Sequence, residues 1–265
     1  MTGKIVDRFV FYPMRYPQGD WELRQVSGAE ERWFMTADGI RLNAWWFPKS
    51  DAELVTLFLH GNAGNVTHRV HHAQAVLAAG SALLVPDYRG YGKSQGHPSE
   101  NGLYTDATAA YAELERLGYR PDQILIQGES LGTAVAVELA TRNRCRGIVL
   151  ESPLKSLSAM AAGVVPVFGS LVARGFNTYN KIRHVHAPLL VIHGEADEIV
   201  PISQGVAVCD AANEPKQLWR VPGAHHNDLL YVAGSEYIVR LRQFYKSIGA
   251  YARRDLHREY TDSAQ

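Results

Sequence analysis

Five short and almost entirely apolar runs constrain the fold of this chain more than any other feature. They are rich in Val, Ile and Leu, and they read LVTLFLH (54–60), SALLVPDY (81–88), QILIQ (123–127), GIVLES (147–152) and PLLVIHG (188–194). Such runs are typical of strands that are covered on both faces of a parallel sheet. Segments with helical spacing lie between most of them, at 67–79, 101–117 and 131–143. This alternation predicts a doubly wound α/β domain.

The N-terminal part departs from the parallel pattern. Two β-rich segments, 31–36 and 40–47, flank an Asp-Gly pair at 38–39, which is a strong signal for a tight hairpin. We therefore expect an antiparallel edge on an otherwise mostly parallel sheet. No repeat, low-complexity tract or linker divides the chain, so residues 1–265 are predicted to form a single domain.

One long connection interrupts the regular pattern. Residues 158–187 lie between two predicted strands and begin with the apolar run AMAAGVVPVFGSLVA. Two interpretations are open: an ordinary crossover helix, or a short lid over a site. Both would bring apolar surface close to the strand ends.

The charge balance narrows the classes of partner. Lys plus Arg and Asp plus Glu are equal at 27 each among 265 residues, so no net field favours nucleic acid or an anionic membrane surface. The N-terminal stretch is interrupted by charges and by Pro13, and no later run is long enough to span a membrane. We expect a soluble, cytoplasmic protein that acts on a small, neutral or apolar molecule.

The motif GESLG, residues 128–132, directly follows one predicted strand and directly opens a predicted helix. A strand, a sharp turn and a helix form the nucleophile elbow of serine hydrolases, in which flanking glycines allow a crowded turn. Ser130 would be the nucleophile, and the backbone N–H of Leu131 would point toward a developing oxyanion. The alternative is a Gly-Ser turn in which Ser130 merely caps the helix.

A serine nucleophile needs a base and an acid that orients the base. Asp197 follows the last apolar run by three residues, at the same predicted sheet edge as Ser130. Glu151, at the end of the preceding run, is a competing acid, and two further carboxylates flank Asp197, namely Glu195 and Glu198. The base is sought in GAHHNDLLY (223–231), where two adjacent histidines occur.

A second oxyanion donor is expected from the loop HGNAGN, residues 60–65, which follows the first apolar run. Gly61 and Gly64 allow a tight turn, and the N–H of Asn62 is the natural partner for that of Leu131. A simple strand-to-helix turn, with Asn65 or Thr67 capping the next helix, is compatible with the same sequence.

Six motifs in a fixed order resemble those of the α/β-hydrolase superfamily, in the cap-poor branch that includes bacterial esterases and mammalian protein depalmitoylases. They are FYP (11–13), HGNAGN (60–65), DYRGYGKSQG (87–96), GESLG (128–132), HGEADEIVP (193–201) and HHND (225–228). The resemblance implies that Ser130 is the nucleophile, Asp197 the acid, and His226, directly before Asn-Asp, the base. His225 stands where the family commonly has glycine.

Other histidines invite a metal hypothesis. His68, His71 and His72 in THRVHH have helical spacing, but no glutamate lies between them as in zinc-binding HExxH helices. A solvated helix face accounts better for them. His60 and His193 each precede a glycine at a predicted strand exit and are interpreted as structural. No metal and no cofactor is expected.

The function predicted from these features is that of a serine carboxylesterase that cleaves uncharged esters with short to medium acyl chains. The alternative is a thioesterase of the depalmitoylase type, because a similar triad serves both reactions. A hydrolase fold that only binds ligands is a third class, which the presence of serine, aspartate and histidine disfavours.

Overall fold

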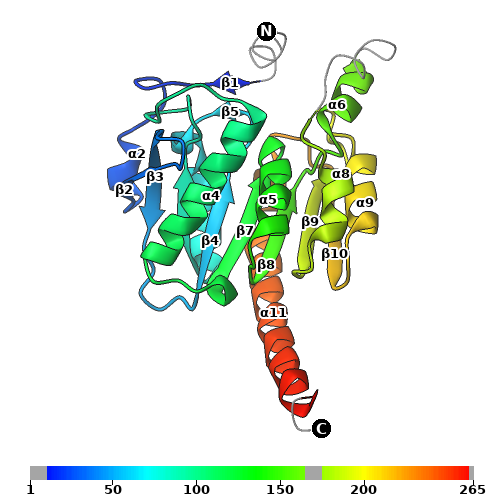
Figure 1. The fold of residues 1–265 in the computed structure, drawn as a ribbon. Helices are drawn as coiled ribbons and strands as arrows, with labels where there is room; N and C mark the ends of the chain where they lie inside the picture. Colours follow the sequence, from blue (N-terminus) through cyan, green and yellow to red (C-terminus); the bar gives the residue numbers. More distant parts are fainter. Residues whose placement is uncertain (1–10, 165–174, 263–265) are drawn as a thin grey trace.

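The computed structural model describes residues 11–164 and 175–262, and these are built around an eight-stranded sheet (Figure 1). The strand order is β10-β9-β8-β7-β4-β6-β3-β2. The strands are β2 (Glu30–Met35), β3 (Arg41–Phe47), β4 (Leu54–Leu59), β6 (Ser81–Pro86), β7 (Ile124–Glu129), β8 (Gly147–Glu151), β9 (Leu189–Gly194) and β10 (Lys216–Val221). Each of the five apolar runs forms a strand at the centre of this sheet.

The pairing confirms the predicted mixture of strand directions. β4, β6, β7, β8, β9 and β10 are parallel, whereas β3 is antiparallel to both β2 and β6. The register is continuous through the centre, where Ile126 of β7 lies opposite Leu57 of β4 and Ile148 of β8. At the hairpin between β2 and β3, Gly39 has φ 80°, as a tight turn requires. The antiparallel edge is therefore confirmed.

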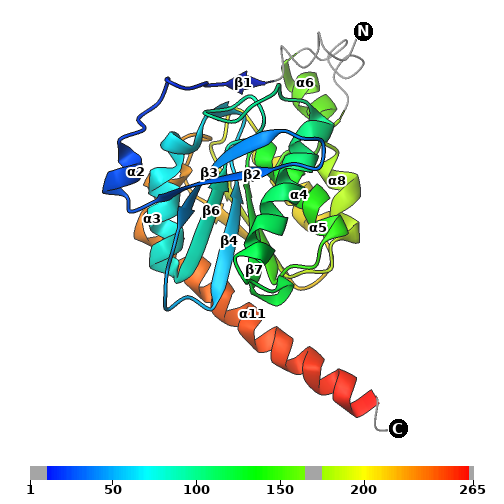
Figure 2. The same cartoon turned by 60° about the vertical axis from the view of Figure 1, so that its left-hand side comes forward.

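Helices cover both faces of the sheet, as the doubly wound pattern predicts. α3 and α11 pack on one face, whereas α4, α5, α8 and α9 cover the other (Figure 2). None of the described helices is both long and apolar enough to cross a membrane. The helices are α2 (Leu23–Val26), η1 (Val66–Arg69), α3 (Val70–Ala79), α4 (Glu100–Arg116), η2 (Pro121–Gln123), α5 (Leu131–Arg142), α6 (Leu157–Val164), α8 (Thr178–Lys181), η3 (Ile182–His184), α9 (Ile202–Ala211), α10 (Leu229–Ala233) and α11 (Ser235–Asp262).

Each face of the sheet has its own apolar core, because successive strand residues point to opposite sides. Along β4, Leu57 and Leu59 enter the core beneath α4 and α5, whereas Phe58 enters the core beneath α3 and α11. All three side chains are fully buried. Burial on both faces explains why the sequence of β4 shows no polar alternation.

A small second sheet lies at the carboxyl edge of the main one. β1 (Tyr12–Pro13) pairs in parallel with β5 (Ala63–Gly64), so the N-terminal segment is tied to the loop that follows β4. In Figure 1 this pair and α6 lie along the upper edge of the molecule. The predicted lid or crossover at 158–187 includes α6 and α8, but its residues 165–174 lie outside the described part of the chain.

Two glycines set how closely α5 approaches the strands. A Cβ atom added to Gly132 would lie 2.0 Å from the carbonyl oxygen of Leu59 in β4. A Cβ atom on Gly128 would lie 2.5 Å from the carbonyl oxygen of Gly132. Both obstacles are backbone atoms, which cannot turn aside as a flexible side chain can. The start of α5 therefore lies against the ends of β4 and β7 only because these two positions lack side chains.

We expect the Gly132→Ala variant to lose about 1–3 kcal/mol of its free energy of unfolding, or more, because the new methyl group overpacks a backbone contact. Urea denaturation followed by circular dichroism measures the change. Gly249→Ala is the matched control, because the nearest atom to its added Cβ would be 3.7 Å away and alanine favours a helix. Equal stability of the two variants would contradict the close approach.

Candidate active site

Ser130 lies at the sharp turn between β7 and α5, where the sequence predicts a nucleophile. Its backbone has φ 51° and ψ −117°, a conformation that residues with side chains rarely adopt. The turn is held on both sides: the Ser130 N–H donates to the Glu151 carbonyl at 2.9 Å, and the Thr133 N–H donates to the Ser130 carbonyl at 3.0 Å. Strained residues held in this way cluster at functional sites.

His226 lies between Ser130 and Asp197 and contacts both. Its Nε2 is 3.0 Å from Ser130 Oγ, and its Nδ1 is 2.8 Å from Asp197 Oδ2. The three side chains come from the turn after β7, the loop after β9 and the loop between β10 and α10. The fold thus brings together three predicted residues that are far apart in sequence. This chain of contacts can move a proton from a serine hydroxyl to an imidazole.

Asp197 is held ionised by its surroundings. It is 6% exposed, and its Oδ1 accepts hydrogen bonds from the N–H groups of Ile199 at 3.0 Å and Val200 at 2.7 Å. His193 Nε2 lies 3.5 Å from the other oxygen. Burial raises the pKa of Asp197, but the contacts with His193 and His226 outweigh burial and hold the pKa well below its usual range. A charged carboxylate here can fix the tautomer of His226.

Glu151, the competing acid, is engaged elsewhere. Its Oε1 accepts hydrogen bonds from Gln127 Nε2 at 2.5 Å and from the Tyr237 hydroxyl at 2.6 Å. Its Oε2 lies 3.4 Å from His72 Nε2. The carboxylate is buried among these partners, whereas His226 turns its Nδ1 to Asp197. Of the two carboxylates that the sequence left as alternatives, Asp197 contacts His226 and Glu151 contacts other residues.

His225 and His226 are neighbours in sequence with opposite surroundings. The His225 side chain is 56% exposed, compared with 10% for His226. His225 Nδ1 lies 2.9 Å from Glu198 Oε2, and its backbone N–H donates to Asp228. The hydrogen bond with Glu198 raises the pKa of His225. This exposed pair lies at the border of the site. Glu198 therefore contacts His225 rather than His226.

Leu131 and Asn62, the predicted oxyanion donors, lie on the two segments that meet at Ser130. Leu131 is the first residue of α5, so its N–H has no partner within the helix. Asn62 lies in the loop after β4. A Cβ atom on its neighbour Gly61 would be 3.5 Å from the Ser130 Cβ. The loop therefore passes directly beside the serine.

Two tyrosines that the sequence left without a role hold the Asn62 side chain. Its Oδ1 accepts hydrogen bonds from the Tyr12 N–H at 3.2 Å and from the Tyr91 hydroxyl at 3.0 Å. Tyr12 belongs to FYP and Tyr91 to DYRGYG, two of the six ordered motifs. The motifs indicated that both tyrosines lie in segments shared with the family. The spacing of residues in the sequence gave no indication that both contact Asn62.

The THRVHH histidines have separate partners. His68 Nδ1 lies 3.3 Å from the Asn65 N–H and completes a capping box at the start of η1. His72 approaches the buried Glu151, and His71 is exposed. Within the ranges that the structure describes, no three His, Cys, Asp or Glu side chains gather as a metal would require.

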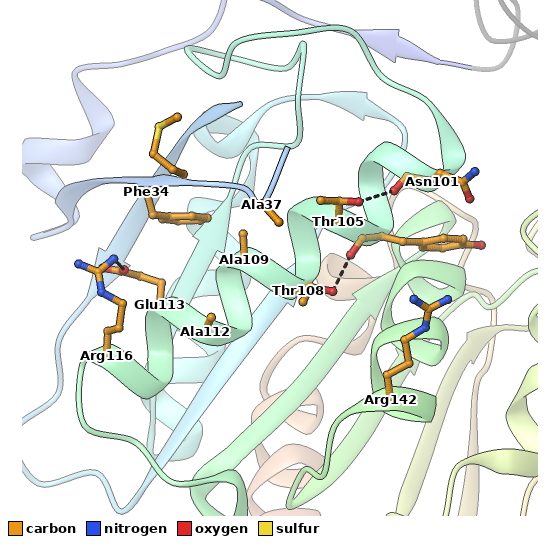
Figure 3. A pocket seen from close by; sticks show the side chains of 12 residues that line it. Phe34, Ala37, Asn101, Thr105, Thr108, Ala109, Ala112, Glu113, Arg116 and Arg142 are labelled. Carbon is orange, nitrogen blue, oxygen red and sulfur yellow. Dashed lines mark hydrogen bonds and ion pairs between the residues drawn. The ribbon is translucent and has the colours of Figure 1, made fainter. Parts of the chain in front are cut away.

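A pocket of about 560 Å³ lies away from these residues (Figure 3). It is lined by Phe34 of β2, by Thr105, Thr108 and other residues of α4, and by Arg142 at the end of α5. Ser130, Asp197 and His226 are not among its lining residues. The hydroxyls of both threonines donate to carbonyls of their own helix, and the two lining arginines, Arg116 and Arg142, are paired with Glu113 and Glu138.

Comparison with known proteins gives relatives that cover most of the chain. "Uncharacterized protein Rv2307c" of Mycobacterium tuberculosis is 39% identical over 214 residues, which are 79% of this chain and 76% of that protein. "Alpha/beta hydrolase domain-containing protein 17C" of Homo sapiens is 35% identical over 238 residues, which are 86% of this chain and 69% of that protein. Among solved structures, the Pyrococcus furiosus esterase Pf2001 superposes with a TM-score of 0.76 at 22% identity, over 90% of this chain and 98% of that chain.

The match to a family agrees with the observed architecture. Residues 56–187 match the family described as "alpha/beta hydrolase fold", a range that begins within β4, ends just before β9 and includes the turn at Ser130. The mixed sheet, its helices on both faces and the serine turn after β7 are all features of that fold. The chain therefore belongs to the α/β-hydrolase fold family.

Proposed function

We propose that this protein is a serine hydrolase of the carboxylesterase type, in which Ser130 is the nucleophile, His226 the general base and Asp197 the acid that orients it. One observation supports this most strongly: His226 contacts Ser130 Oγ through Nε2 and Asp197 through Nδ1, at 3.0 and 2.8 Å. If Ser130 served only to cap α5, its hydroxyl would not need a contact with His226, and His226 would not need a contact with Asp197.

The first half of the proposed reaction forms an acyl-enzyme. Ser130 Oγ attacks the ester carbonyl carbon while its proton passes to His226 Nε2. The N–H groups of Leu131 and Asn62 stabilise the negative oxygen of the tetrahedral intermediate. The intermediate collapses when the carbon–oxygen bond to the alcohol breaks, and the alcohol leaves with the proton from His226. Asp197 stabilises the imidazolium between these steps.

The second half releases the acid. His226 takes a proton from a water molecule, the water oxygen attacks the acyl carbon, and the same two N–H groups stabilise the new intermediate. Collapse breaks the bond to Ser130 Oγ, which regains its proton from His226. Every proton is carried by these residues and by water, so the cycle needs no cofactor.

An uncharged ester is the substrate that the surrounding charges favour. Arg69 beside the serine turn is paired with Glu129, and His225 is paired with Glu198. Both side chains already have a carboxylate partner, so an anionic acyl group would gain little from them. A thioester substrate of the depalmitoylase type is the alternative, because the same acyl-enzyme steps serve a thiol leaving group.

We expect Ser130→Ala to lose both ester hydrolysis and covalent labelling by a fluorophosphonate probe, since the labelled atom is the missing Oγ. The loss of turnover should be about four orders of magnitude or more. Gel fluorescence of wild type and variant measures the labelling. Unchanged labelling of Ser130→Ala, or no labelling of the wild type, would contradict the proposed nucleophile.

The two adjacent histidines provide an internal comparison. His226→Ala should reduce kcat by about four orders of magnitude, because no other group then accepts the serine proton. His225→Ala should retain kcat within about threefold, because an exposed ion pair contributes little. Initial rates on p-nitrophenyl butyrate compare the variants. The reverse ranking would assign the base to His225.

Acyl chain length and leaving group separate the proposed esterase from the thioesterase. We expect kcat/KM for p-nitrophenyl acetate or butyrate to exceed that for the palmitate ester by at least about tenfold, and to exceed that for acyl thioesters of equal chain length. A panel of matched esters and thioesters measures both ratios. Preference for the palmitoyl thioester would favour the depalmitoylase-type activity.

A further inference from the structure

An ion pair next to the nucleophile has no part in the triad. Glu129 directly precedes Ser130, and its Oε2 lies 2.7 Å from Arg69 Nε. The side chains are 25% and 11% exposed, respectively. Arg69 is the last residue of η1, on the far side of the loop that follows β4. The pair therefore connects the end of η1, which follows the loop that carries Asn62, to the serine turn.

Each member of the pair also holds one backbone group of this loop. Glu129 Oε2 accepts the Gly61 N–H at 3.2 Å, and Arg69 Nη2 donates to the Ala63 carbonyl at 3.1 Å. Gly61 and Ala63 are the two neighbours of Asn62. The Arg69–Glu129 pair therefore restrains the backbone on both sides of the predicted oxyanion donor.

The carbonyl side of the peptide that carries the Asn62 N–H is held as well. His60 Nδ1 donates to the Gly61 carbonyl at 2.7 Å. That carbonyl and the Asn62 N–H belong to the same planar peptide group, so a bond to one fixes the direction of the other. Glu129 holds the Gly61 N–H, which belongs to the preceding peptide group, so the peptide groups on both sides of Gly61 are held.

We propose that the Arg69–Glu129 pair is a positioning unit, which sets the direction of the Asn62 N–H toward the oxyanion. This inference depends on the proposed esterase function, because it concerns the same reaction. Preorganised donors are effective only when they already point to the place where charge develops. Errors of a few tenths of an ångström in such groups are costly, and a glycine-containing loop has no intrinsic rigidity to prevent them.

The pair also balances charge beside the serine. Burial raises the pKa of Glu129, but the Arg69 guanidinium together with His72, the Gly61 N–H and His60 outweighs burial and lowers this pKa to about 2. Glu129 is therefore ionised at every pH at which a histidine base works. A carboxylate without a partner next to Ser130 would repel a developing oxyanion, and Arg69 removes that repulsion while it holds the loop.

Three variants test the unit: Arg69→Gln, Glu129→Gln and the double variant. Arg69→Gln should lower kcat about 30- to 100-fold and change KM less than about threefold. This loss in kcat is smaller than the roughly 10²- to 10³-fold loss expected when a whole oxyanion donor is removed. Glu129→Gln keeps an oxygen that can accept the Gly61 N–H, so it should lower kcat only about tenfold. The double variant should be no slower than Arg69→Gln, because it lacks the unpaired carboxylate.

The matched control is Arg120→Gln, which removes an arginine from an exposed ion pair with Asp122 just before the other end of β7. Its kcat should stay within about twofold of wild type. A second readout separates positioning from general loosening of the fold. The affinity for a trifluoromethyl ketone, which forms a tetrahedral adduct on serine, should fall in parallel with kcat/KM across the three variants. Thermal unfolding should stay unchanged for Glu129→Gln.

Each outcome decides between distinct conclusions. If the wild type neither hydrolyses esters nor labels with the fluorophosphonate, the proposed function itself fails. If the wild type is active and a folded Arg69→Gln variant keeps kcat within twofold, the positioning unit is overturned and the esterase function stands. If Arg69→Gln does not fold, the near-isosteric Glu129→Gln variant decides alone. A Glu129→Gln variant with the kcat and ketone affinity of the wild type overturns the proposal. A parallel loss of about tenfold in both quantities supports it.

Discussion

The geometry of this site depends on one close backbone contact, in which the first turn of α5 lies against the carbonyl end of β4. The contact exists because Gly132 offers no Cβ to the Leu59 carbonyl. It places the start of α5, and therefore Ser130 and Leu131, beside the loop that begins at His60. The pairing of β7 with β8 then supplies the Glu151 carbonyl that anchors the Ser130 N–H. The absence of a side chain at Gly132, as at Gly128, thus connects the packing of the sheet with the position of Ser130.

Much of the fold could be predicted because central strands have an unambiguous pattern. Val, Ile and Leu fill β4, β6, β8 and β9, since both faces of these strands are buried. β10 was not predicted, because its sequence KQLWRV mixes polar and apolar residues without a regular period, and five of its six residues are partly buried or exposed. The pairing of β1 with β5 was also missed, since two residues per strand carry no periodicity that sequence reasoning could detect.

The candidate site could likewise be predicted only in part. Ser130 and Asp197 could be named from sequence because each follows a predicted strand. His226 was named from the family resemblance, which places the base directly before Asn-Asp, in the chain order of this fold. The contacts that support them could not be named. Arg69 meets Glu129, and Tyr91 meets Asn62, across separations that leave no local pattern. The segment THRVHH is an example. The metal hypothesis considered only its histidines, but its Arg69 contacts Glu129 at the serine turn, whereas His68 caps a helix.

Carboxylates around the serine illustrate why residue type alone could not rank the acids. Glu129 is paired with Arg69, Glu198 with His225, and Glu151 with Tyr237, Gln127 and His72. A buried or half-buried carboxylate without such a partner would either take up a proton or destabilise the fold. Once these three are compensated, Asp197 is the acid whose partner also contacts Ser130. Asp197 is therefore distinguished from the other carboxylates by what its histidine contacts, a property of the folded chain that no spacing in the sequence encodes.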